Sequence, residues 1–410
     1  MQTTAVCERT APTSWPDSGP ASPPASGELP DTMHPLIKPA LRRAWRSRDT
    51  VQFGMTRAHA VVVSPVDTAT GAFLSLLDGT RGLPLLREQA TAMGLEEGRA
   101  DAVVQRLATA GLLDDRSTGR DGTTSPAPGA AGDRLRPDLF SLALLHSEPG
   151  AAAHLLAARR RARVQVRGAG RVGAAVAALL SASGVGRVDV MDGGCVEPWD
   201  AGPGGVDPEQ AGERREAAAR RVVRRTASQP PPRARAGGGA PPEPPLSLTV
   251  LAPRDGLAVY APDPAGAREL LAAGIPHLYA GVVEATGVVG PLVLPGRSAC
   301  AGCLELAEVD RDATWPRMLA QWRSGRRSAV PSCDMALATV VAGLTASWAL
   351  AFLDGGSRVN AGSRLELALP GPGWSSRPVA PHPRCPCGAA GSGDPDGPSA
   401  AGAPHGRMHG

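Results

Sequence analysis

The sequence predicts an α/β protein in which a Rossmann-like domain follows a small winged-helix-like module. Three observations support this prediction. A glycine-rich loop separates a short strand from an apolar helix, two close cysteine pairs lie in the C-terminal half, and short helical patterns crowd the N-terminal third. The length of 410 residues allows two or three domains, since single domains usually contain about 100 to 200 residues.

Segments rich in proline, glycine, serine and alanine divide the chain. Residues 1–30 and 389–410 lack hydrophobic periodicity, and we expect both to be disordered tails. Residues 116–134 have the composition of an interdomain linker. The predicted domains are 34–115 and 135–388, the second interrupted by a proline- and glycine-rich insertion at 226–245.

The first domain begins with extended segments and continues with helices. Residues 50–53 and 60–63 are short β-prone runs that predict a small hairpin. Three helical patterns follow, at 70–77, 83–93 and 99–113. Glycines stop the first two patterns, as expected at helix C-termini. A hairpin with three short helices is typical of a winged-helix-like module.

The second domain begins with a β-α-β pattern. Residues 163–166 form the first expected strand, an apolar helix continues to about residue 183, and 187–192 form the next strand. Residues 246–252 predict a further strand after the insertion. Strands that alternate with helices indicate a parallel sheet with Rossmann-like order.

The loop of this unit has the spacing of a nucleotide-binding motif. Gly168, Gly170 and Gly173 follow the GxGxxG pattern, and Asp192 ends the second strand. In a nucleotide site the first glycine makes the turn, the second admits phosphate and the third packs helix on strand, while the acid accepts from ribose hydroxyls. Backbone packing alone would also require these glycines, so nucleotide binding stays open.

Two cysteine pairs have the spacing of metal ligands. Cys300, Cys303, Cys385 and Cys387 can close a tetrahedral Zn²⁺ site without an open position, which predicts a structural role. Buried free thiols and a redox pair are the alternatives, but a redox pair normally opens a helix of a thioredoxin-like fold. Seven cysteines without a secretion signal favour a reducing, cytoplasmic location.

The segment 335–353 is uncharged over a length that could span a membrane. Its polar residues and its lack of a basic flank favour a buried helix and no membrane contact. Cys333 precedes this segment, where a helix dipole could make it nucleophilic, although an inert thiol in a capping segment is the alternative. The net charge of +4, with few aromatic residues, predicts no nucleic-acid partner.

Residues 163–388 resemble the ThiF/MoeB family of ubiquitin-activating-type adenylyltransferases. The resemblance is carried by the glycine loop, the strand ending at Asp192, the paired cysteines, and Pro331-Ser332-Cys333 before an apolar helix. It implies ATP and Mg²⁺ binding, zinc in a four-cysteine site, and adenylation of the C-terminal carboxylate of a small ubiquitin-like or sulfur-carrier protein. It also implies a homodimer formed near the apolar helix.

A closer resemblance is to the ThiF-like partner proteins of azoline-forming, YcaO-type peptide cyclodehydratases, which bind leader peptides. It is carried by His277-Leu278, by 289–293 with Pro295-Gly296, and by Asp310-Arg311-Asp312 before Trp315-Pro316. In that branch a winged-helix peptide-recognition module lies upstream, and residues 34–115 are similar to it. This implies a peptide partner and a peptide-modifying enzyme.

The chain departs from active members of the family at their cationic residues. Residues 200–204 replace the segment that carries the triphosphate arginine, and Arg215 stands where the family has its phosphate-contacting lysine. Asp255 and Asp263 are the candidates for the metal-proximal acid. Loss of two cations predicts a degenerate, leader-binding partner. The alternative is an active adenylyltransferase that uses Arg215 and Cys333, so enzymatic activity stays open.

Overall fold

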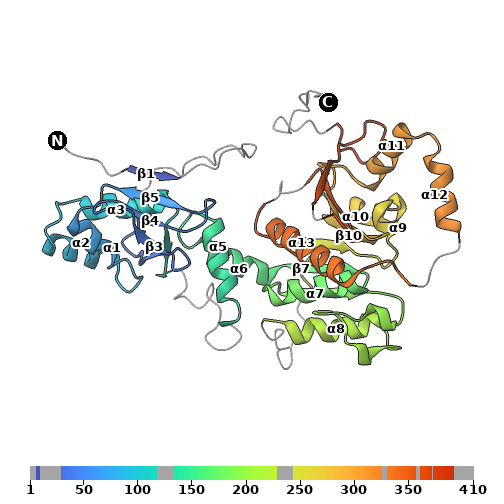
Figure 1. The fold of residues 1–410 in the computed structure, drawn as a ribbon, viewed down its shortest axis with the longest axis horizontal. Coiled ribbons are helices and arrows are strands. Elements are labelled where there is room, and N and C mark those ends of the chain that lie inside the picture. The colour runs from blue at the N-terminus through green and yellow to red at the C-terminus, as the bar shows by residue number, and fades with distance from the viewer. Residues whose placement is uncertain are drawn as a thin grey trace. The chain divides into compact units, whose positions relative to one another are not determined.

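The computed structural model describes residues 6–9, 29–117, 133–228, 243–325, 330–356, 361–371 and 373–391. The chain divides into two compact units (Figure 1). The first unit contains Met1–Arg161 with the short pieces Ser183–Gly186 and Ala227–Arg235, and the second contains the remaining residues.

A four-stranded antiparallel sheet forms one side of the first unit, in the order β1-β5-β4-β3. Its strands are β1 (Val6–Arg9), β3 (Arg43–Trp45), β4 (Val51–Phe53) and β5 (Val61–Ser64). Strands β4 and β5 are the expected hairpin, which is confirmed. Strand β1 lies within the segment that we expected to be disordered. Residues 1–5 and 10–28 of that segment lie outside the described residues, so the disordered tail stays a prediction.

Three helices complete the core of the first unit, namely α1 (Thr68–Leu74), α2 (Leu83–Ala92) and α3 (Arg99–Thr109). Phe53, Phe73 and Leu107 are buried together between the helices and the sheet. The third helix ends earlier than predicted because Gly111 turns the chain with a φ of +73°. The chain then forms β6 (Leu113–Asp115), which pairs with β2 (Pro35–Ile37). The identification as a winged helix stays a prediction.

Helices α5 (Arg136–Leu145) and α6 (Ala151–Arg161) belong to the first unit. Residues 118–132 of the expected linker lie outside the described residues, so the linker at 116–134 stays a prediction. The Nζ atom of Lys38 donates to the carbonyl of His146 at 3.0 Å, and the backbone N–H of Gly150 donates to Asp114 at 2.8 Å. The only lysine of the chain is therefore a buried structural group in this unit.

The second unit is built on a seven-stranded mixed sheet in the order β13-β12-β11-β10-β9-β7-β8. Strands β8, β7, β9 and β10 run parallel, and β10 to β13 are antiparallel. The strands are β7 (Arg163–Arg167), β8 (Arg187–Met191), β9 (Leu248–Leu251), β10 (His277–Val283), β11 (Thr286–Val293), β12 (Ser363–Ala368) and β13 (Ser375–Pro378). The three predicted strands are confirmed with small shifts at their ends.

Seven α-helices and three short 3₁₀ segments accompany the described part of this sheet. They are α7 (Arg171–Ala182), α8 (Arg215–Thr226), α9 (Leu257–Tyr260), α10 (Arg268–Ala272), α11 (Ala301–Arg311), α12 (Trp315–Ser324) and α13 (Met335–Leu353), with η2 (Pro198–Asp200), η3 (Pro208–Gln210) and η4 (Pro264–Ala267). The Rossmann-like order of strand, helix and strand is therefore present from β7 to β8.

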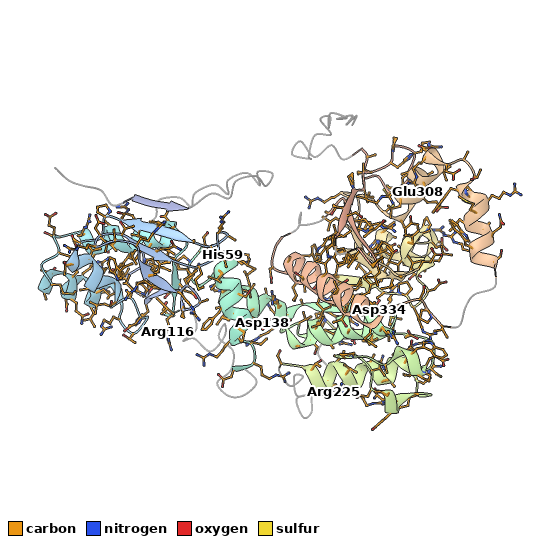
Figure 2. The ribbon with its side chains drawn as sticks, viewed as in Figure 1. His59, Arg116, Asp138, Arg225, Glu308 and Asp334 are labelled. Carbon is orange, nitrogen blue, oxygen red and sulfur yellow. The ribbon has the colours of Figure 1, made fainter. Side chains whose placement is uncertain are left out.

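Asp334, which Figure 2 labels, is the N-cap of α13, and its carboxylate accepts the N–H of Leu337 at 3.0 Å. Of the described helices, α13 is long and apolar enough to cross a membrane. One of its faces nevertheless packs against α7 and against β10 and β11, as Figure 1 shows for α7. Val341 and Trp348 are buried there. The prediction of a buried helix therefore holds for one face of α13.

Candidate functional site

The glycine loop lies where the strand order of the sheet reverses. Strand β7 has β8 on one side and β9 on the other, so the loops that follow β7 and β9 meet at the carboxyl ends of the strands. Open α/β sheets bind ligands in the crevice at such a switch point. The loop after β7 contains the predicted glycines, and the loop after β9 contains Ala252, Pro253 and Arg254.

Backbone packing explains two of the three glycines. Gly168 has a φ of +107°, and a Cβ atom there would lie 2.0 Å from the carbonyl oxygen of Ala252. A Cβ atom at Gly173 would lie 2.0 Å from the carbonyl oxygen of Gly168. Real atoms cannot approach so closely, so the β-α-β unit itself requires both glycines. Their presence is therefore not evidence of a bound nucleotide.

Asp192 follows β8 and accepts hydrogen bonds from protein groups. Its carboxylate accepts the N–H of Ala169 at 2.9 Å, the N–H of Gly194 at 2.8 Å and Nε of Arg215 at 2.9 Å. Burial alone would raise the pKa of Asp192, but the hydrogen bonds from Gly194, Arg215 and Ala169 together hold its pKa below the ordinary value. The predicted ribose-binding acid is thus engaged by the chain itself.

Arg215 bridges two carboxylates at the start of α8. Its Nη1 atom donates to Asp200 at 3.0 Å, in addition to the bond from Nε to Asp192. Burial would lower the pKa of Arg215, but the two carboxylates raise it above its ordinary value. A Cβ atom at Gly194 would lie 1.8 Å from this guanidinium, so the arginine packs directly on the loop. The side chain does not point freely toward a phosphate.

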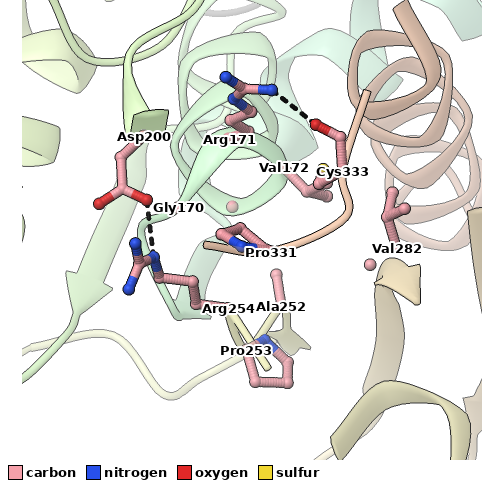
Figure 3. A pocket seen from close by; sticks show the side chains of 12 residues that line it. Gly170, Arg171, Val172, Asp200, Ala252, Pro253, Arg254, Val282, Pro331 and Cys333 are labelled. Carbon is pink, nitrogen blue, oxygen red and sulfur yellow. Dashed lines mark hydrogen bonds and ion pairs between the residues drawn. The ribbon is translucent and has the colours of Figure 1, made fainter. Parts of the chain in front are cut away.

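Arg254 is the second cation of this network, and sequence reasoning did not identify it. Its Nε atom donates to Asp200 at 2.7 Å (Figure 3). Its guanidinium lies 5.8 Å from the ring centroid of Trp199. A Cβ atom built at Gly170 would lie 3.4 Å from Cγ of Arg254. The stem of this arginine therefore contacts the glycine at which a phosphate would approach the backbone.

The cavity that remains at the glycine loop is small. It measures about 20 Å³ and is lined by Gly170, Arg171, Asp200, Arg254 and Cys333, among others (Figure 3). This volume holds about one water molecule. Arg171 donates to the carbonyl of Cys333 at 2.6 Å and so ties the start of α7 to the segment before α13. Protein side chains thus fill most of this crevice.

Cys333 lines this cavity, and burial is the main cause that raises the pKa of its thiol. A raised pKa reduces the thiolate that nucleophilic attack needs. The two candidate metal-proximal acids have local structural partners. Asp255 accepts the N–H of Leu257 at 3.1 Å, and Asp263 accepts the N–H of Ala265 at 2.9 Å. Asp263 is therefore the N-cap of η4, and Asp255 stabilises the turn before α9.

A larger open cleft of about 890 Å³ begins beside this network. Arg215 and Arg254 lie at one side of it, and Tyr260, Trp322 and Glu284 also contribute to its walls. The indole of Trp322 is 47% exposed. The volume of the cleft lies within the range of small-molecule sites. Both arginines that reach it are held by carboxylates.

The two cysteine pairs meet as predicted, since α11 and the segment 385–387 bring all four sulfur atoms within 4.8 Å of one another. The Sγ atoms of Cys300 and Cys385 are 3.6 Å apart, as are those of Cys303 and Cys387. A tetrahedral Zn²⁺ with bonds of about 2.3 Å needs S···S separations of about 3.8 Å. The cluster therefore fits a four-coordinate metal ion and has no open position. The hydrogen bond from Cys300 lowers the pKa of the Cys303 thiol and raises the pKa of the Cys300 thiol.

The glycine loop, the parallel strands and the four-cysteine cluster define a protein with an adenylyltransferase-like α/β fold. The model of the ThiF family matches residues 149–387, which is more than half of the chain. The chain belongs to the ThiF family, and the predicted resemblance is confirmed. No curated relative matches its sequence.

Solved structures share this fold at low sequence identity. The crystal structure of E. coli MccB with succinimide aligns with a TM-score of 0.60 and 14% identity, covering 87% of this chain and 99% of that chain. E. coli MccB with ATP aligns with a TM-score of 0.59 and 15% identity, covering 86% and 99%. The heterocyclase TruD aligns with a TM-score of 0.56 and 17% identity, covering 87% of this chain and 43% of that chain.

Proposed function

We propose that the chain is a catalytically degenerate ThiF-family protein that binds a peptide for a peptide-modifying enzyme. The observation that carries this proposal is the ion-pair network at the switch point. Arg254 lies against Gly170, Arg215 holds Asp192, and Asp200 joins the two arginines. A nucleotide would have to displace all of these side chains.

At the glycine loop, the described residues leave too little room for ATP and Mg²⁺. The cavity at the glycine loop is about 20 Å³, whereas sites for ligands of this class measure about 300–1,000 Å³. Ribose hydroxyls would compete with Arg215 for Asp192, which already accepts three hydrogen bonds. The position of the family's lysine is filled by a cation that is already paired with two acids. On this proposal, adenylation has lost the phosphate site at the glycine loop and an unpaired positive charge beside it.

The relatives support the peptide part of the proposal. Structures of E. coli MccB include complexes with N-formylated MccA and with selenomethionine-labelled MccA, and TruD is a heterocyclase. In the first unit of this chain, strand β5 of the hairpin has β4 on one side and β1 on the other, so an extended peptide could add to its outer edge in place of β1. Strand addition uses main-chain hydrogen bonds and therefore tolerates varied sequences. We propose this edge as the peptide-binding element.

Titration calorimetry with ATP and Mg²⁺ tests the degenerate site. We expect no binding at millimolar ATP, whereas E. coli MccB, which has been crystallised with ATP, serves as the positive control. Saturable binding that disappears in Asp192→Asn, with the fold of the variant checked by circular dichroism, would contradict the proposal. Capture of a peptide substrate together with its modifying enzyme by the tagged full chain tests the binding role.

The cleft of about 890 Å³ favours a second candidate function. Because Arg215 and Arg254 border it, an active adenylyltransferase could use them if they left their carboxylates. Its substrate would be the C-terminal carboxylate of a small ubiquitin-like or sulfur-carrier protein. Carrier-dependent exchange of labelled pyrophosphate into ATP would support this function, and Arg215→Ala would abolish the exchange.

We also propose that the four-cysteine cluster holds a structural Zn²⁺. The thiolates supply the soft ligands and the tetrahedral spacing that zinc prefers. Reduced cysteines fit the cytoplasm, which we propose as the location of the protein. The ion would connect the start of α11 to the segment 385–387 and would have a structural role only.

A further inference from the structure

The N-terminal strand β1 occupies an edge of the first unit's sheet. It pairs antiparallel with β5 in a register that runs from Val6 opposite Ser64 to Arg9 opposite Val61. Without β1, strand β5 would be the outer strand on this side, since its other neighbour is β4. The outer backbone N–H and C=O groups of β5 are the groups that an added peptide would need. The chain therefore satisfies them with its own segment.

The two edges of this sheet differ in the protection that their side chains give. Strand β3, at the opposite edge, consists of exposed residues that include Arg43, and charged residues discourage pairing with other chains. Strand β5 contains Val61, Val62 and Val63 and has no charged residue. An uncovered edge with three consecutive valines would favour unintended pairing. The edge of β5 is thus the one suited to accept a strand.

We propose that Val6–Arg9 is an internal competitor that must leave β5 before a peptide can pair there. This inference rests on the proposed peptide-binding function and adds a regulatory step to the same edge. Main-chain pairing makes β1 and an incoming peptide mutually exclusive, because β5 has one outer row of hydrogen-bonding groups. Binding of the peptide therefore requires release of the N-terminal segment.

The tether makes this competition strong even if β1 binds weakly. Strand β1 belongs to the same chain as β5 and therefore competes as an intramolecular ligand, for which effective concentrations of about 1 mM are typical. If a free copy of β1 bound with a dissociation constant of roughly 0.1 mM, the tethered copy would reduce the apparent affinity of a competing peptide about ten-fold. Removing the segment should restore that affinity.

Hydrogen exchange in the full chain tests whether β1 covers β5. We expect deletion of residues 1–12 to speed amide exchange in residues 61–64 at least ten-fold. The double variant Cys7→Pro/Glu8→Pro should do the same, because successive N–H groups of a strand point to opposite sides, so one of the two prolines removes a donor that faces β5. The matched control Ser22→Pro/Ala25→Pro keeps β1 intact and should leave the exchange unchanged. Unchanged exchange in both the deletion and the Cys7→Pro/Glu8→Pro variant would overturn the inference.

A labelled peptide tests the competition directly. The probe is a fluorescein-labelled copy of residues 1–12 that carries Cys7→Ser, measured by fluorescence anisotropy. We expect it to bind the deletion variant about ten-fold more tightly than the full chain and to restore the slow exchange of residues 61–64. Equal affinity for both proteins would overturn the inference.

The exchange result also separates this inference from the proposed function. Faster exchange in the deletion variant supports β1 as the cover of β5, whether or not the chain captures a foreign peptide. Failure to capture a foreign peptide would contradict the peptide-binding role alone. Capture of a peptide substrate together with unchanged exchange would retain the peptide-binding role and overturn the internal competitor.

Discussion

The arginine at position 215 suits its place because a guanidinium can bridge two carboxylates. Arg215 donates through Nε to Asp192 and through Nη1 to Asp200, a planar fork that an ammonium group does not reproduce. All three side chains are at most 10% exposed, so each charge requires its partners. Arg215 therefore acts as an internal clamp between two carboxylates.

Removal of the clamp should destabilise the second unit. Arg215→Ala would leave Asp192 without its cation and Asp200 with Arg254 alone. Breaking a buried ion pair typically costs about 3–5 kcal/mol, and urea unfolding followed by circular dichroism measures the loss. Arg220, an exposed arginine of the same helix that pairs with Glu216, provides the control. Arg220→Ala should cost less than about 1 kcal/mol, and equal losses would contradict a special role for Arg215.

The acid dependence of stability should report Asp192. Its pKa is lowered in the folded protein from an ordinary value of 3.8, so its ionised form stabilises the fold above that value. This stabilisation is lost as the pH falls below about 4 through the folded pKa. We expect the free energy of unfolding of the wild type to fall more steeply over this range than that of Asp192→Asn. Parallel pH profiles would show that the carboxylate is not stabilised by its neighbours.

At the scale of the element, the glycine loop should be sensitive to substitution without any ligand. Gly168→Ala would place a methyl group 2.0 Å from a backbone oxygen at a φ of +107°, so we expect a loss above about 4 kcal/mol. Gly193 follows the next strand and has no atom within 4 Å of an added Cβ. Gly193→Ala should therefore change stability by less than about 0.5 kcal/mol. Thermal unfolding of both variants makes the comparison, and a tolerated Gly168→Ala would refute the backbone-packing explanation.

The cysteine cluster should release metal in one step with loss of local structure. We expect about one Zn²⁺ per chain by elemental analysis, and Cys387→Ser should lower this content because the site would keep three thiolates. Chelation should speed proteolysis near α11 and the segment 385–387. Cys195 is exposed and lies outside the cluster, so Cys195→Ser should retain the metal. Full zinc content in Cys387→Ser would argue against the four-cysteine site.

Local patterns predicted the elements that local forces determine. The β-α-β unit, the β4–β5 hairpin and the bounds of α13 could be predicted because apolar runs and glycine or acidic boundaries mark them. The end of α3 and the pairing of β1 could not be predicted from local patterns. Strand β6 pairs with β2, far away in the sequence, and β1 lies in a segment whose composition indicates disorder.

The candidate site, too, could be predicted from the sequence only in part. Spacing predicted the glycine loop, Asp192 and the four cysteines, but the partner of Asp200 lies 54 positions away in the loop after β9. A single arginine in such a loop carries no periodic signal, and its contact with Gly170 depends on how two loops meet at the switch point. The closed state of the crevice is therefore a property of tertiary structure.

At the scale of the whole molecule, packing sets the division into units at Arg161. The low-complexity composition of 116–134 suggested an earlier boundary. Leu135, Leu142 and Leu156 form a common cluster, and Lys38 and Asp114 bond to the backbone that joins α5 to α6. Composition identifies where a chain can be flexible, whereas contacts decide which helices belong together.

The environment of α13 distinguishes a core helix from a membrane span. Val340 and Val341 are neighbours in sequence, but Val340 is 46% exposed and Val341 is fully buried. If α13 packs on the sheet of a water-soluble chain, Val341→Glu buries an unpaired carboxylate and should prevent stable folding. Val340→Glu should change the free energy of unfolding by less than about 0.5 kcal/mol. In a lipid-embedded helix both charges would be costly, so equal damage from the two variants, measured by solubility without detergent and urea unfolding, would contradict the core-helix assignment. Because the two positions share the same local sequence, only the surroundings of the helix can produce the expected difference.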